Sequence, residues 1–263
     1  MPSDGWPQPP LASRLLLDKI GEDRANLLRT RGLLAITVRR PEQQQETGIQ
    51  WYTEPPDATR SDLCWYTDGS MMFGPVWELH RTGCAIVAVS TSGELVAFGN
   101  AVPAPWVRTA AAAELWAVML VLAYTIQPPR IVTDCLSILT AAAAGLALAA
   151  GPDRPLAQLW ARIATILDAD VSVLCTRGHL VWMPAHGAAA SIGNAFRSDG
   201  EFVTSTDWRA NRLADALAKA AIATVTECIG AEKVLKVAES LVRHECCPWR
   251  CNLRSQPPCC EHH

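Results

Sequence analysis

The fold is decided by residues 63–70, LCWYTDGS, where an apolar run ends at an acidic turn. Leu63–Thr67 is rich in aromatic and β-prone residues, and the Asp-Gly pair that follows is a common turn signal. We therefore predict a buried strand that ends at Asp68. Two more strands are expected at Gly83–Ser90 and Glu94–Ala101, because a short Ser-Gly turn joins these runs as in a hairpin.

Helices and strands alternate after the hairpin. Ala110–Thr125 is rich in Ala and Leu and two prolines follow it, which is typical of a helix and its end. Arg130–Thr133 predicts a short strand and Val171–Met183 a strand-like segment, with helices at about 134–150, 156–167 and 207–226. This order predicts an α/β domain with a five-stranded mixed sheet, three antiparallel strands followed by two parallel ones, and helices on both faces.

The composition limits the classes of protein to which the chain can belong. Its 263 residues suit one medium domain with extensions or two small domains, and a hydrophobic share of 49% is enough for a core. The formal net charge is −3, whereas a protein that holds nucleic acid by phosphate neutralisation alone is usually basic. A nucleic-acid function would therefore need metal ions or a partner to supply positive charge.

Neither a secretory signal nor a membrane span is expected. Met1–Pro10 is polar and rich in proline, and the most apolar stretch, Ala110–Ile126, is short for a bilayer and contains Glu114. We therefore expect no membrane partner and an intracellular location, in the nucleus or the cytoplasm. In such a compartment the interior cysteines are interpreted as reduced core residues, namely Cys64, Cys84, Cys135, Cys175 and Cys228.

Three regions are predicted along the chain. Residues 1–60 are interpreted as an N-terminal leader and linker, with the remnant of an upstream domain as one explanation, since Pro41–Thr59 is rich in Gln, Glu and Pro. Residues 61–226 form the α/β domain. Residues 227–263 are expected to form a helix and a Cys/His-rich tail, for which a frayed terminus is favoured over a zinc site because Cys-x₂-Cys pairs are lacking.

Four acidic residues occupy unusual places, namely Asp68, Glu114, Asp134 and Asp215. Asp68 ends the first strand and Asp134 follows the fourth, so their carboxylates would lie side by side if these strands are neighbours. Glu114 and Asp215 could reach the same sheet edge from helices packed on it. Clustered carboxylates repel one another unless cations neutralise them, and hard oxygen ligands select Mg²⁺ or Mn²⁺. A two-metal site of the phosphoryl-transfer type is therefore the chemical hypothesis.

Each acid also has an ordinary structural explanation. Asp68 could belong only to a turn, and Glu114 could lie at a helix boundary. Asp134 could be a helix N-cap, which is the favoured explanation for that residue taken alone, and Asp215 could be a solvated helix position. The joint pattern, rather than any single acid, favours the metal site.

Five motifs resemble those of the ribonuclease H family, in particular its type 1 and retroelement branch. In order they are Thr67-Asp68-Gly69-Ser70, Ala113-Glu114-Leu115-Trp116-Ala117, Val132-Thr133-Asp134, Trp182-Met183-Pro184-Ala185-His186-Gly187 and Asn211–Ala218. Each motif is weak alone, but together they occur in family order between Leu63 and Ile222.

The resemblance implies the ribonuclease H-like fold and hydrolysis of the RNA strand of RNA–DNA hybrids by a two-metal-ion mechanism. Matched residue by residue, it implies two Mg²⁺ ions, with Mn²⁺ as an alternative, held by Asp68, Glu114, Asp134 and Asp215. It implies that His186 assists proton transfer or product release, although this histidine could also be a loop residue without a role. The implied substrate contacts are Gly69, Ser70, Thr109 and Asn211, and the implied protein partner is a reverse transcriptase domain.

The chain also departs from the family pattern. Residues 110–113 are alanines, where type 1 enzymes have amide and Arg side chains that contact the hybrid, and Leu156–Leu167 carries only Arg162 instead of a Lys-rich helix. Weak and salt-sensitive affinity for a free hybrid is therefore expected. An insertion, Ala188–Thr206, separates His186 from Asp215, and a tolerated loop is slightly favoured over a flexible lid.

Four of the ten tryptophans are expected in the core. Those on predicted strands or helices are Trp65, Trp116, Trp160 and Trp182. Trp106 and Trp208 lie near loops, where either could stack on a nucleotide, although a structural role is favoured.

Two other functions stay open beside the hybrid endonuclease. The first is a catalytically weak or inactive module of the same fold that binds nucleic acid or acts as a scaffold. The second is another nuclease of this fold, such as a DNA-cleaving transposase or a 3′–5′ exonuclease. The Asp-Gly-Ser turn and the His186 loop favour ribonuclease H over the other nucleases.

Overall fold

The computed structural model describes residues 10–31, 42–56, 62–74, 79–185, 187–223 and 230–243. It divides the chain into two compact units, one of residues 42–225 and one of residues 1–41 with 226–263. The second unit contains α1 (Leu11–Ile20), α2 (Glu22–Arg31) and a helix over residues 230–243, and the Ser13 hydroxyl lies 3.4 Å from the carbonyl oxygen of Val237. Both ends of the chain therefore contribute helices to the same unit.

The larger unit contains a six-stranded mixed sheet in the order β1-β4-β3-β2-β5-β6. The antiparallel strands β2, β3 and β4 occupy its centre, and β5 and β6 continue from β2 in parallel. The strands are β1 (Gln50–Thr53), β2 (Cys64–Met72), β3 (Arg81–Val89), β4 (Leu95–Ala101), β5 (Arg130–Thr133) and β6 (Leu180–Trp182). The predicted α/β class and the three antiparallel and two parallel strands are confirmed.

The prediction of five strands is wrong, because β1 adds a sixth strand antiparallel to β4. This strand lies within the segment that was interpreted as a linker. It is held by tertiary contacts rather than by a local pattern, since the Trp51 ring packs 6.4 Å from that of Trp65 and 5.2 Å from that of Tyr124.

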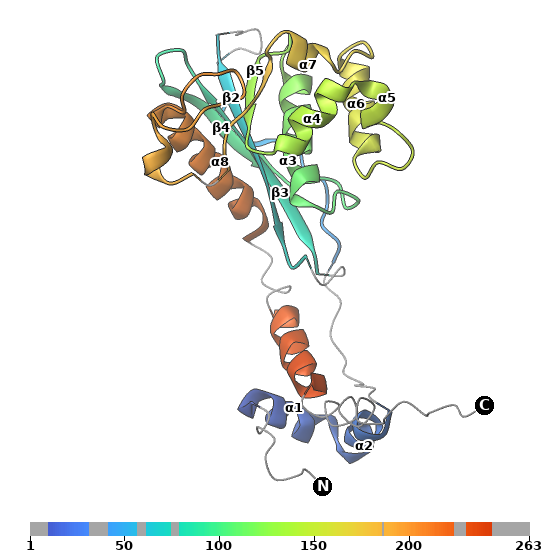
Figure 1. Cartoon of the computed structure of the whole chain (residues 1–263). Coiled ribbons are helices and arrows are strands. Elements are labelled where there is room, and N and C mark those ends of the chain that lie inside the picture. The colour runs from blue at the N-terminus through green and yellow to red at the C-terminus, as the bar shows by residue number, and fades with distance from the viewer. Residues whose placement is uncertain are drawn as a thin grey trace, which may run out of the picture. The chain divides into compact units, whose positions relative to one another are not determined.

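Helices cover both faces of the sheet, with α8 on one side and α3, α4 and α6 on the other (Figure 1). The helices of this unit are α3 (Ala110–Tyr124), α4 (Leu136–Ala144), α5 (Leu146–Ala149), α6 (Ala157–Ile166), α7 (Val173–Thr176), a 3₁₀ turn η1 (Ala189–Ser191) and α8 (Ser205–Ala223). The helix expected over 134–150 is divided at Gly145, whose positive φ of 82° interrupts helical geometry. In the described parts of the chain, none of the helices is long and apolar enough to span a bilayer.

The core is divided between the two faces of the sheet by the alternation of side chains along β2. Trp65 points to the cluster shared with α3 and α6, and its neighbour Tyr66 points to the cluster shared with α8. Trp116 and Trp160 are also fully buried, as the sequence predicts. A buried aromatic on each face ties the central strand to both helical layers.

Two glycines set how closely the helices approach the sheet. A Cβ atom added to Gly69 in β2 would lie 2.2 Å from the backbone nitrogen of Glu114, and one added to Gly83 in β3 would lie 2.5 Å from the carbonyl oxygen of Ala218. Since Cβ atoms do not approach backbone so closely, α3 can pack on β2 and α8 on β3 only because these positions lack a side chain.

Candidate metal centre

Asp68 and Asp134 are brought together by the parallel pairing of β2 with β5. Thr67 pairs with Thr133 in this register, so the acids that follow them in sequence lie at the same place on neighbouring strands. Both carboxylates therefore reach the carboxyl end of β5, where sites in α/β sheets commonly form.

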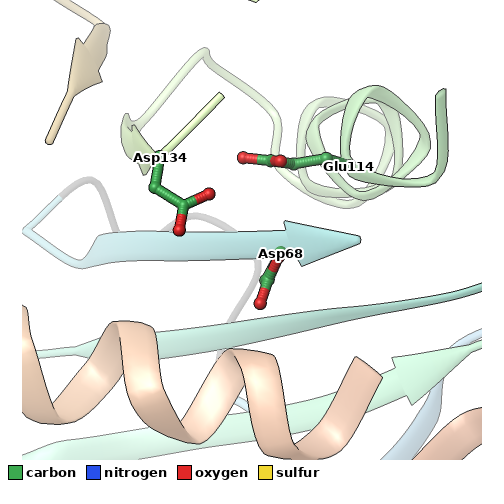
Figure 2. A group of neighbouring side chains, drawn as sticks. All are labelled: Asp68, Glu114 and Asp134. Atoms are coloured by element: carbon green, nitrogen blue, oxygen red, sulfur yellow. The ribbon is translucent and has the colours of Figure 1, made fainter. Parts of the chain in front are cut away.

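Glu114 joins this pair from the neighbouring helix α3. Figure 2 shows its side chain extending from the helix toward Asp134, above the strand that bears Asp68. Ligand oxygens of Asp68, Glu114 and Asp134 all lie within 4.8 Å of one another. The three residues will be called the carboxylate cluster, and their oxygens are close enough to share a hard cation.

Hydrogen bonds fix each member of the carboxylate cluster. One oxygen of Glu114, Oε1, accepts from the Thr133 hydroxyl and from the Cys135 backbone N–H, the latter at 3.1 Å. Asp68 Oδ1 accepts from the Gly69 N–H at 2.7 Å, and Asp134 Oδ2 accepts from Asn211 Nδ2 at 3.2 Å. These donors orient the carboxylates before any cation binds, as partners of metal ligands commonly do.

Burial and mutual repulsion disfavour the charged forms of the carboxylates in the cluster. Burial, and then the charge of Asp134, raises the pKa of Asp68 to about 7. The same two causes raise the pKa of Glu114, which is only 4% exposed. A divalent cation among these oxygens would reverse both effects, because it stabilises the deprotonated forms.

Asp215, the fourth acid expected to ligate metal, lies outside the carboxylate cluster. It is part-exposed on α8 and its carboxylate pairs with Lys219 Nζ at 2.6 Å. Its charge still raises the pKa of Asp68, and Lys219 lowers it, so both residues lie within electrostatic reach of the cluster. The structure thus brings three of the four acids together and leaves the role of Asp215 a prediction.

The other predicted site residues differ in what they do. His186 lies outside the described residues. Gly69 and Ser70 continue β2 beyond Asp68, and Thr109 is the N-cap of α3, accepting from the Ala112 N–H at 3.0 Å. Asn211 is buried on α8 and contacts Asp134. A substrate role for these residues stays a prediction.

Thr133 is a site residue that the sequence analysis did not single out. It stood inside the third motif, directly before Asp134, but nothing local showed that its hydroxyl would face Glu114. The contact depends on the packing of α3 against β5, which brings together residues that are distant in the chain. A polar side chain at a fully buried strand end was the available signal.

The insertion at 188–206 is fastened to the sheet by a buried ion pair that was also missed. Asp207 is 1% exposed and accepts from Arg197 Nη1 at 2.8 Å and from the Tyr66 hydroxyl at 2.6 Å. Although burial alone would raise it, the pKa of Asp207 is lowered by hydrogen bonds from Thr204 and Tyr66. Of the two explanations offered for the insertion, these contacts favour an ordered loop over a flexible lid.

The strand order and the helices on both faces are those expected for the ribonuclease H-like fold, and the acids in the middle of β2, directly after β5 and near the start of α3 form a candidate metal centre. The chain matches neither a protein-family model nor a curated protein. It is similar to solved structures, of which three are described below at 16–21% identity.

Three of these structures are ribonuclease H proteins or contain a reverse transcriptase. The native protease-reverse transcriptase of prototype foamy virus matches at 21% identity and a TM-score of 0.43, over 67% of this chain. The chain covers only 23% of the length of that protein. The solution structure of the PFV RNase H domain matches at 20% identity and TM-score 0.41, covering 61% of this chain and 93% of that one. LC9-RNase H1, a type 1 RNase H with the type 2 active-site motif, matches at 16% identity and a TM-score of 0.40. The match covers 68% of this chain and 84% of that one.

Proposed function

We propose that this protein is a metal-dependent endonuclease that hydrolyses the RNA strand of RNA–DNA hybrids, of the retroelement type. The observation that supports the proposal best is the convergence of Asp68, Glu114 and Asp134 from two strands and a helix. In the sequence, these acids occur in the order, and with the flanking residues, that resemble the ribonuclease H motifs. A reverse transcriptase domain is the proposed protein partner.

The residues fit Mg²⁺ or Mn²⁺ as the resident cations. The cluster offers carboxylate oxygens without thiolate or imidazole ligands among the described residues, which favours a hard cation over Zn²⁺. Burial and the neighbouring Asp134 carboxylate raise the pKa of Asp68, and a bound cation would offset both effects. Bound there, a pair of divalent cations would activate the attacking water and stabilise the leaving 3′ oxygen.

The protein's own contribution is to hold the carboxylates in place. Thr133 and the Cys135 N–H both bind Oε1 of Glu114, which leaves the other oxygen of that carboxylate for a cation. Asn211 holds Asp134 in the same manner from α8. Asp215 would complete the ligand set by exchanging its ion pair with Lys219 for a bond to a cation.

One observation favours the alternative of a binding or scaffold module. The first turn of α3 presents Ala110–Ala112 beside Gly69, where amide and Arg side chains would be needed for the family's hybrid contacts. Loss of those contacts weakens substrate binding but does not alter the carboxylate cluster. Turnover rather than binding therefore separates the two functions.

The test is cleavage by the full chain of an end-labelled RNA–DNA hybrid, with duplex DNA, single-stranded DNA and single-stranded RNA in parallel. We expect hybrid-specific cleavage in Mg²⁺ or Mn²⁺ that Asp68→Asn abolishes. Asp153→Asn makes the same chemical change at an exposed acid outside the cluster and should leave the rate unchanged. Cleavage that survives Asp68→Asn would exclude the proposal, and binding of the hybrid without cleavage would favour the module.

A further inference from the structure

A cavity of about 770 Å³ opens among α3, α4, α5 and α6, which lie on one side of the sheet (Figure 1). It will be called the α4 groove, and its wall includes Leu136, Ala144, Leu148, Arg154 and Trp160. No member of the carboxylate cluster lies in this wall. The α4 groove is therefore a separate feature of the helical layer, and its possible ligands can be argued from its own lining.

The lining of the α4 groove is apolar although part of it is open to solvent. Leu136 is 52% exposed and Leu148 is 57% exposed, and the wall adds alanines of α4 and α5 and the indole of Trp160. Single exposed leucines are common, but apolar side chains that gather around a cavity are typical of a binding site. Pockets for complete small ligands are about 300–1,000 Å³, so the groove has the volume for one.

The hydroxyl groups of the wall are already used within the protein. Thr140 donates to the carbonyl oxygen of Leu136 at 3.0 Å, and the Ser137 hydroxyl lies 3.1 Å from Cys135 Sγ. The Thr109 side chain caps α3. A polar ligand would have to compete with these contacts, which favours a ligand with an apolar body.

Of the residues in the wall, Arg154 alone carries a charge. It is exposed, and its guanidinium has no ion-pair partner among the described residues. Its neighbour in sequence, Asp153, is also exposed but is not part of the wall. A free guanidinium beside an apolar cavity favours an anionic head group, above all a carboxylate, which it can bind through two parallel hydrogen bonds.

The extent of the wall along α4 limits the apolar body of the ligand. The wall residues of this helix run from Leu136 to Ala144, which is ~12 Å along the helix axis at 1.5 Å per residue. An extended aliphatic chain of roughly eight to ten carbons has this length. A nucleic-acid backbone would need a series of cations along the groove, whereas the wall offers a single one.

We propose that the α4 groove binds a medium-chain aliphatic carboxylate, with its chain along α4 and its carboxylate on Arg154. The apolar lining, the single free guanidinium and the length of the wall all fit this one class of ligand. The site is independent of the proposed nuclease activity, because it uses none of the residues that would hold metal or substrate in that reaction, apart from Thr109 at its border.

The first test is calorimetric titration of the full chain with hexanoate, octanoate and decanoate, each below its micellar concentration. We expect one saturable site, with an affinity that rises by up to about fourfold for each added methylene, the value for one buried CH₂. Decanoate should bind roughly threefold to tenfold more tightly than decanol, and decyltrimethylammonium should bind most weakly. The lack of saturable binding, or equal binding of the three ten-carbon probes, overturns the proposal.

Arg154→Gln tests the head group. It should remove the preference for decanoate over decanol and leave the affinity for decanol unchanged. Arg177→Gln makes the same change at an exposed position outside the wall and should keep the preference. If the two variants retain the same preference, the carboxylate is not bound by Arg154 and the proposal is wrong.

Ala144→Phe tests the place of the chain, because the ring would fill the groove from an exposed position at the end of α4. It should lower the affinity for decanoate by about tenfold or more, the effect of several methylenes that are no longer buried. Ala143→Phe adds the same ring to the same helix outside the wall and should bind decanoate as wild type does. Equal affinities of the two variants exclude the groove as the site.

Phosphatidylglycerol vesicles distinguish a free acid from a membrane surface. Binding of vesicles without binding of free decanoate would overturn the proposal, since it would assign the apolar side chains to a lipid surface. Cleavage of an RNA–DNA hybrid is not a readout in any of these experiments. The nuclease proposal and the carboxylate site can therefore fail separately.

Discussion

Thr133 donates its hydroxyl hydrogen bond to Oε1 of Glu114, and both side chains are buried between β5 and α3. The same oxygen accepts from the Cys135 N–H, so the loop after β5 holds a residue of α3 as well as presenting Asp134. The orientation of the Glu114 side chain therefore depends on β5, a strand that lies 19 residues further along the chain. The orientation of the carboxylate cluster therefore rests on the packing of α3 against the sheet.

Thr133→Val should weaken metal binding without unfolding the chain. The substitution keeps the shape but removes the donor, and loss of such partners typically lowers metal affinity by about 10–100-fold. Titration of Mn²⁺ into the two proteins by calorimetry measures the effect. Thr133→Ser keeps the hydroxyl and should stay within about threefold of wild type, and equal affinities for wild type and Thr133→Val would show that the hydrogen bond has no part in orienting Glu114.

The metal-free chain should become less stable as the pH rises from about 4 toward 7. Because burial and Asp134 raise the pKa of Asp68 from 3.8 to about 7, the folded chain retains a proton that the unfolded chain has lost in this interval. The stability from this proton is complete below pH 4 and is lost as the pH passes 7. The raised pKa of Asp68 corresponds to a loss of ~4 kcal/mol at most in the free energy of unfolding. The raised pKa of Glu114 adds a further loss of the same sign.

Urea unfolding in EDTA at pH 5 and pH 8 measures this dependence. Asp68→Asn should lose a large part of it, because the amide does not titrate. Adding Mn²⁺ at pH 8 should restore stability to wild type, since the cation binds the deprotonated cluster. A free energy of unfolding that is the same at both pH values contradicts the electrostatic description of the cluster.

Lys219 is expected to restrain Asp215 in the metal-free chain. Its ammonium pairs with Asp215 and lowers the pKa of Asp68, so Lys219→Ala leaves the centre more negative. We expect a tighter affinity for Mn²⁺ by roughly threefold to tenfold at low ionic strength, the effect of one nearby charge. Lys236→Ala breaks a similar i,i+4 pair with Glu232 in the other unit and should leave the affinity unchanged. Weaker binding in Lys219→Ala would mean that Lys219 supports the ligand set.

Gly69→Ala should destabilise the chain and distort the centre together. Its methyl group would lie 2.2 Å from the backbone nitrogen of Glu114, so α3 must move away from β2. Overpacking of this kind costs about 1–3 kcal/mol or more. Gly48→Ala meets no atom within 4 Å and should be nearly neutral. If Gly69→Ala unfolds at the same urea concentration as Gly48→Ala, the close approach of α3 is not needed for the fold.

Local patterns predict most of the sheet and the acids at its edge. The run that ends at Asp68 and the short strand before Asp134 are buried and β-prone, and their parallel pairing follows from the order of elements. The placement of Glu114 could be expected because a charge in an apolar helix needs a partner. The prediction that the first strand ends at Asp68 is wrong, however, because β2 continues to Met72 through its pairing with β3.

Features held by distant contacts could not be predicted in the same way. The strand β1 is four residues long and exists because it pairs with β4 beside Gly99, whose lack of a side chain admits the carbonyl oxygen of Gln50. Val173–Thr176 is β-prone yet forms α7, where the Asp170 side chain accepts from the Ser172 N–H at 3.1 Å and starts a turn. Tertiary pairing in the first case and a side-chain turn in the second accompany structures that the local propensity does not predict.

The most direct measurement is the anomalous difference map of crystals of the wild-type chain grown with Mn²⁺ at pH 8. Peaks with ligands from Asp68, Glu114 and Asp134 are the predicted result, with Asp215 released from Lys219 to join them. A well-ordered map in which Mn²⁺ binds elsewhere, or in which these three carboxylates share no ion, would contradict the metal centre and with it the proposed nuclease.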